Sequence, residues 1–91
     1  MLKLKNIKNT HICVNSSDGT HSIERTIPLA EKGFKISFIA YEEFDRINEL
    51  RKYENVSLYI LNSIEPKKYN KLLTYINLTK RINPDLIIVH F

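Results

Sequence analysis

Side chains able to bind a ligand lie at two distant points of this sequence. The segment 18–21, Asp-Gly-Thr-His, follows a β-rich run over residues 10–15, and His90 lies near the end of an apolar run over residues 85–91. Free N–H groups at the start of a helix attract anions, and a guanidinium group can hold a phosphate through two hydrogen bonds. We therefore predict that five residues bind substrate: Gly19, Thr20, His21, Arg25 and His90.

Each of these residues also has a purely structural interpretation, which the sequence leaves open. Gly19 permits a turn, and Thr20 can cap the following helix by accepting a backbone N–H. Arg25 can form an exposed charged face together with Glu24. His21 can simply lie in solvent, and His90 can be a partly buried structural residue. No residue is assigned a catalytic role.

Other chemical groups form no complete site. His11 and Cys13 alternate along the first β-rich run and point the same way, but a metal site needs three or four ligands, so no metal is predicted. Glu42, Glu43 and Asp45 stand where dinucleotide enzymes place a ribose-binding acid, but the glycine fingerprint of those enzymes is missing. We expect a solvated acidic loop there, and no cofactor.

The pattern of apolar residues predicts strands alternating with helices. Four strands are expected over residues 10–15, 34–41, 56–61 and 85–91. The expected helices are one over 22–32, bent at Pro28 and ended by Gly33, a short one over 46–52, and a long one from Pro66 that carries Tyr69, Leu72, Leu73, Ile76 and Ile82. The order β-α-β-α-β-α-β favours an α/β fold, a Rossmann-like parallel sheet of about four strands.

The last strand has a predicted place in this sheet. In doubly wound folds the fourth strand usually lies beside the first, on the side away from the second. Residues 85–91 are apolar in the manner of a strand covered on both faces, but the 91 residues contain no following helix to cover one of them. Uncovered apolar edge strands tend to pair with another strand, so we predict a homodimer or larger homo-oligomer.

Three stretches together resemble a known family. They are Asp18-Gly-Thr-His-Ser-Ile-Glu-Arg-Thr-Ile-Pro-Leu-Ala-Glu-Lys-Gly33, Phe34-Lys-Ile-Ser-Phe-Ile-Ala-Tyr41 and Asn83-Pro-Asp-Leu-Ile-Ile-Val-His-Phe91. In order and spacing they resemble the N-terminal, acceptor-side half-domain of GT-B-fold glycosyltransferases, in the retaining, nucleotide-sugar-dependent group often called family 4. The similarity spans residues 10–91, after a basic N-terminal tail over residues 1–9.

The resemblance implies a function shared between two domains. In that family the N-terminal domain mainly holds the acceptor, while a second Rossmann-like domain binds the nucleotide-sugar donor. Residues 10–91 are then an incomplete, truncated half-domain, inactive without a donor domain that is either missing or on a separate chain, and a sugar or glycan acceptor is the expected ligand. The alternative is a stand-alone, non-catalytic Rossmann-like module that binds an anion or nucleotide or associates with itself.

The composition indicates in which compartment the protein is expected and which partners are not expected. A single cysteine, Cys13, excludes a disulfide framework and favours a reducing compartment, so a cytoplasmic protein is expected. No apolar run approaches the ~20 residues that a membrane-spanning helix needs. The net charge is +4, but the lysines are spread along the chain among acidic residues, so nucleic acid is not a predicted partner.

Overall fold

Four parallel strands form a single sheet in the order β3-β2-β1-β4. The computed structural model describes residues 10–16, 19–61 and 71–90. The strands are β1 (His11–Ser16), β2 (Lys35–Ala40), β3 (Val56–Ile60) and β4 (Leu86–His90). Each lies within a predicted strand or extends one residue beyond it. The α/β, Rossmann-like fold class and the place of the fourth strand beside the first are therefore confirmed.

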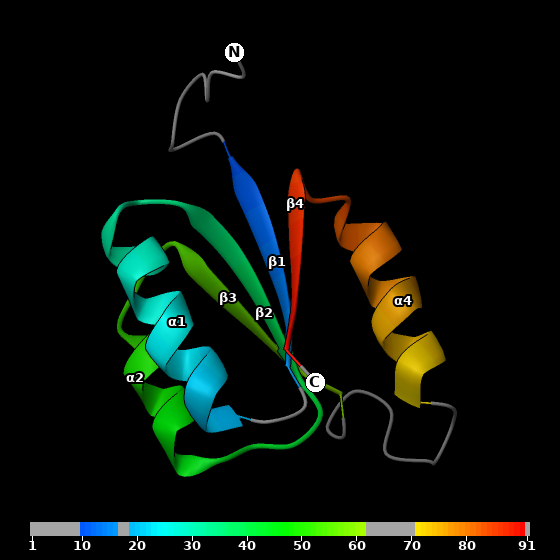
Figure 1. The fold of residues 1–91 in the computed structure, drawn as a ribbon, viewed down its shortest axis with the longest axis horizontal. Helices are drawn as coiled ribbons and strands as arrows, with labels where there is room; N and C mark the ends of the chain where they lie inside the picture. Colours follow the sequence, from blue (N-terminus) through cyan, green and yellow to red (C-terminus); the bar gives the residue numbers. More distant parts are fainter. Residues whose placement is uncertain (1–9, 17–18, 62–70, 91) are drawn as a thin grey trace.

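Helices cover both faces of the sheet (Figure 1). They are α1 (Gly19–Glu31), the short 3-10 helix η2 (Asp45–Ile47), α2 (Asn48–Arg51) and α4 (Lys71–Ile82). Helices α1 and α2 lie on one face and α4 on the other. Residues 62–70, where the predicted long helix begins, are outside the described residues, as is the tail over residues 1–9. None of the described helices is long and apolar enough to cross a membrane.

Helix α1 begins earlier than the sequence indicates, and it passes through its proline. Buried Ile23 and Ala30 pack on the sheet, whereas Pro28 is exposed, so the N–H that proline lacks is missing on the solvent side. The chain leaves the helix at Gly33, whose φ of 95° suits glycine and whose N–H donates to the carbonyl of Ala30 at 3.0 Å. Gly33 therefore ends the helix as predicted.

The two faces of the sheet bury different kinds of side chain. On the α1 side the core is apolar, and it includes Ile12, Val14, Ile36 and Phe38. On the α4 side the smaller cluster contains Cys13, Ile39, Leu61 and Tyr75. Successive residues of a strand point to opposite faces, so β1 and β2 each supply residues to both clusters. The β1–β2 pair is thus held between a large apolar layer and a smaller, partly polar one.

The face that α4 turns to the sheet differs from the predicted one. Tyr75 and Thr79 are buried against β1, and the Thr79 hydroxyl donates to Oδ1 of buried Asn15 at 3.3 Å. Leu73 and Ile76, which the sequence pattern places on the apolar stripe, are 54% and 44% exposed. The buried amide oxygen of Asn15 needs a hydrogen-bond donor, and Thr79 supplies it. The polar side of α4 therefore faces the sheet here.

Strand β4 forms an exposed apolar edge. Leu86, Ile87 and Val89 are each about half exposed, and they alternate between the two faces of the sheet. Ile88 packs against the core on the α1 side, but the described helices pack mainly over β1, β2 and β3 and leave the other apolar residues of β4 half exposed. The predicted uncovered apolar edge is present.

Candidate functional site

The site lies where the carboxyl ends of β1 and β4 meet. From β1 the chain passes through α1 to β2 on one side, whereas β4 lies on the other side and is reached through α4 (Figure 1). Such a reversal leaves a crevice beyond the carboxyl ends of the strands, where ligands of open α/β sheets bind. The register pairs Ser16 with His90 at this edge. The first turn of α1 lies at the same edge.

A serine–histidine hydrogen bond joins α1 to β4 here. Oγ of Ser22 lies 2.9 Å from Nδ1 of His90, and either atom can carry the hydrogen. Ser22 is fully buried, whereas His90 is half-buried. Nε2 of His90 makes no hydrogen bond to any of the described residues. Within the described part of the chain, the imidazole is thus held at one nitrogen and is without a partner at the other.

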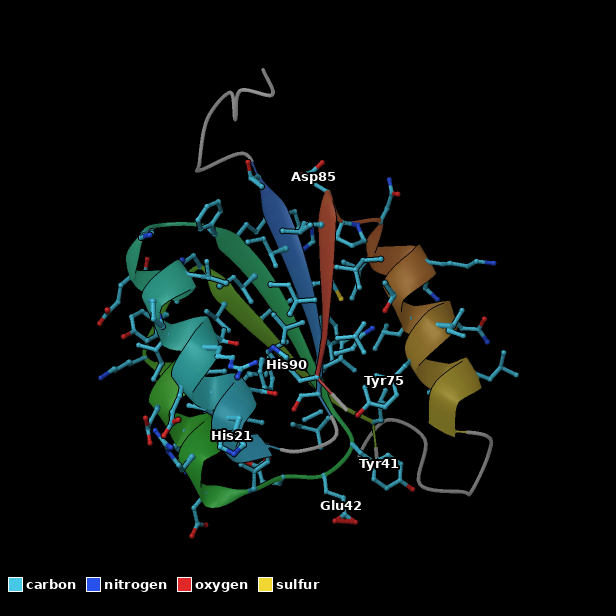
Figure 2. All side chains as sticks on the ribbon, in the orientation of Figure 1. His21, Tyr41, Glu42, Tyr75, Asp85 and His90 are labelled. Carbon is cyan, nitrogen blue, oxygen red and sulfur yellow. The ribbon has the colours of Figure 1, made fainter. Side chains whose placement is uncertain are left out.

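Two more predicted residues lie on α1 near this bond. His21 is exposed in the first turn, and Figure 2 shows it on the same side of the sheet edge as His90. Arg25 is exposed and lies three residues after the buried Ser22, near the middle of the helix. Glu24 instead pairs with Arg46 at 3.1 Å. Arg25 forms no ion pair with the described residues, so its charge is available to a ligand.

Gly19 and Thr20 are the first two residues of α1 rather than part of the preceding loop. Thr20 lies inside the first turn of α1. The backbone N–H groups of a first helical turn have no partner within the helix. The first turn of α1 therefore places helical N–H groups and His21 at one end of the helix, whereas Arg25 lies near its middle, about one turn beyond His21.

Two tyrosines that the sequence analysis did not single out lie on the α4 side of this edge (Figure 2). The Tyr75 hydroxyl donates to the backbone carbonyl of Ser16, the last residue of β1. Burial, and secondarily the neighbouring Tyr41, raises the pKa of Tyr75 to about 12. The phenol therefore keeps its proton and its hydrogen bond at neutral pH. The hydrogen bond between Tyr75 and Ser16 depends on the tertiary fold. The sequence marks Tyr75 only as an aromatic residue within a predicted helix.

Of the acidic residues after β2, Glu43 is engaged with another side chain. Glu43 accepts from Arg51 at 2.7 Å, and this hydrogen bond lowers the pKa of the Glu43 carboxyl. Asp45 begins η2, and Glu42 is exposed and points away from the sheet (Figure 2). Within the described part of the chain they do not converge on the Ser22–His90 bond. They match the expected solvated acidic segment.

The remaining histidine, which is partly buried, and the fully buried cysteine lie away from this site. Nε2 of His11 lies 2.7 Å from Oγ of Ser37, at the amino end of the sheet. Cys13 is fully buried, and this burial raises the pKa of its thiol. Its Sγ lies 3.8 Å from Oγ1 of Thr79. In the described ranges no three or more histidine, cysteine, aspartate or glutamate side chains gather as metal ligands.

Comparison with family models, with curated proteins and with solved structures finds no match to this chain.

Proposed function

We propose that this chain is the acceptor-side half-domain of a nucleotide-sugar-dependent glycosyltransferase, and that it holds a sugar or glycan between the carboxyl ends of β1 and β4. The hydrogen bond between Ser22 and His90 carries the proposal. Two of the three stretches behind the family resemblance, residues 18–33 and 83–91, meet in this bond although its residues are 68 positions apart. Their contact at the expected ligand crevice supports a common binding role.

The groups at this edge suit a hydroxyl-rich ligand. An imidazole nitrogen can donate to or accept from a sugar hydroxyl, and Nε2 of His90 is open among the described residues. Arg25 and the N–H groups of the first α1 turn add positive potential, which favours a phosphate group nearby. The family resemblance assigns the donor nucleotide to a second domain. We therefore propose a separate donor domain as partner, in the same chain or another, and a cytoplasmic location in keeping with the free thiol of Cys13.

A titration followed by nuclear magnetic resonance tests this proposal. The ¹⁵N-labelled chain is mixed in turn with maltose as a glycan, UDP-glucose as a nucleotide sugar and inorganic pyrophosphate as a simple anion. We expect maltose to shift the backbone resonances of His21 and His90 and to leave those of His11 unchanged. The matched variants are His90→Ala, which should weaken the binding of maltose, and His11→Ala, which should not.

The same titration separates the alternative function. Arg25 forms no ion pair with the described residues, and together with the N–H groups at the start of α1 it favours a stand-alone module that binds an anion or nucleotide. In that case pyrophosphate and UDP-glucose shift the resonances at the carboxyl edge, while maltose leaves them unchanged. That outcome would replace the glycosyltransferase proposal, and the absence of binding at this edge would remove both.

A further inference from the structure

We infer that Ser22 is a positioning residue for His90: its hydroxyl fixes the imidazole so that Nε2 is presented to a ligand oxygen at the β1–β4 edge. The inference rests on the proposed function for the identity of the ligand. It assigns a role to a serine that lies in the first stretch of the family resemblance and that the sequence offers no reason to select.

The two residues are held by independent parts of the fold. Ser22 is 0% exposed and belongs to α1, which packs on the sheet through Ile23 in the next position. His90 belongs to β4, and its backbone is placed by its pairing with Ser16 of β1. A histidine side chain on such a fixed backbone still turns about two torsion angles. The hydrogen bond at Nδ1 restricts both, so the open nitrogen keeps one direction.

The bond also restricts the position of the ring proton. If the Ser22 hydroxyl donates to Nδ1, the neutral imidazole carries its proton on Nε2 and donates to the ligand. If the hydroxyl accepts from an N–H at Nδ1, Nε2 is bare and accepts a ligand hydroxyl. Either arrangement commits Nε2 to a single role, whereas a ring without a partner exchanges between the two. Hydrogen bonding at the distal nitrogen is the usual way in which proteins select a histidine tautomer.

A second serine–histidine pair, formed by two strand residues, provides a control. Ser37 is also buried, and its Oγ lies 2.7 Å from Nε2 of His11. This pair lies on the other face of the sheet and at the opposite ends of the strands. Removing the hydroxyl of Ser37 therefore changes the packing of the sheet in a similar way without touching the proposed site.

Side-chain ¹H–¹⁵N spectra of the histidine rings test the inference without any ligand. In the unaltered chain we expect the neutral form of the His90 ring to carry its proton on one nitrogen only. In Ser22→Ala the resonances of the two His90 ring nitrogens should become averaged, while the His11 signals stay unchanged. In Ser37→Ala the reverse is expected. Thermal melting of each variant shows that the chain is folded when its spectrum is recorded.

Two results would overturn the inference. One is an averaged His90 ring in the unaltered chain, which decides the question even if Ser22→Ala fails to fold. The other is a folded Ser22→Ala protein whose His90 tautomer is unchanged. With maltose as probe, Ser22→Ala should weaken binding by about three- to tenfold, the range expected for one hydrogen bond, and Ser37→Ala should leave it unchanged. A fixed ring in a chain that binds no maltose would remove the glycan ligand but retain the positioning role of Ser22.

Discussion

At the scale of single residues, the role of a histidine here depends on the end of the strand at which it lies. His11 and His90 each contact a serine hydroxyl, at 2.7 and 2.9 Å. His90 lies at the carboxyl end of β4, where ligands of parallel sheets bind, and His11 lies at the amino end of β1. The position of His90 followed from its place in an apolar run, but its partner Ser22 did not. A contact spanning 68 residues leaves no periodic signal in the sequence.

His11 should make the stability of the protein depend on pH. Burial, and secondarily the positive charge of Lys35, lowers the pKa of His11 below its usual 6.5. The unfolded chain then binds more protons than the folded chain as the pH falls through this range, so the free energy of unfolding falls with it. The contribution is complete above about pH 6.5 and is lost as the pH drops through the lower, folded-state pKa.

Thermal melting of the chain and of His11→Gln, compared between about pH 7.5 and pH 5, measures this effect. We expect the melting temperature of the unaltered protein to decrease more steeply with falling pH than that of the variant. Equal slopes in the two proteins would show that His11 titrates alike in the folded and unfolded chains.

At the scale of secondary structure, the alternation of strand and helix could be predicted because apolar periodicity is a local property. All four strands and the helix over residues 46–52 are confirmed closely. The buried face of α4 could not be predicted in the same way. Leu73 and Ile76 are the more apolar residues, but Asn15 and Ser16 of β1 offer oxygen atoms that pair with Thr79 and Tyr75. Side-chain partners in another element thus override the local pattern.

The Tyr75 hydroxyl should contribute measurably to the attachment of α4. Tyr75→Phe removes its buried hydrogen bond to the carbonyl of Ser16 and keeps the aromatic ring. We expect the free energy of unfolding in urea to fall by about 1 to 2 kcal/mol. Tyr53→Phe is the matched control, because the Tyr53 hydroxyl donates to Glu31 at an exposed position. It should change stability by less than about 0.5 kcal/mol. An equal decrease in the free energy of unfolding of both variants would show that the hydrogen bond to Ser16 contributes no more than the exposed one.

At the scale of the whole molecule, activity is expected to require more than the described fold. In the glycosyltransferase family that the chain resembles, donor and acceptor are held by two domains, and transfer requires both reactants to be positioned together. We therefore expect the 91-residue chain alone to transfer no glucose from UDP-glucose to maltose. Product formation can be followed by mass spectrometry. Turnover that persists through rigorous purification would contradict this expectation.

The exposed edge of the sheet is expected to mediate self-association. Strand β4 presents half-exposed Leu86, Ile87 and Val89, together with one row of backbone groups that no other described strand pairs. Such edges pair readily with another strand. Two copies related by a two-fold axis would pair their β4 strands antiparallel. Centred on Ile88, this pairing places Ile87 of each copy opposite Val89 of the other and covers apolar side chains on both faces. We therefore expect a homodimer.

Light scattering after gel filtration checks this expectation, with Ile87→Lys as the test and Leu73→Lys as its match. The two side chains are 50% and 54% exposed, so each substitution removes a similar apolar surface, but only Ile87 lies on the edge strand. Ile87→Lys would place a charge opposite the apolar Val89 of the other copy and make the two new lysines diagonal neighbours across the axis. This variant should therefore be monomeric at concentrations where Leu73→Lys and the unaltered chain are dimers. A monomeric unaltered chain at high concentration, with a cooperative melt, would contradict pairing through β4. Loss of the dimer in Leu73→Lys alone would place the contact on α4.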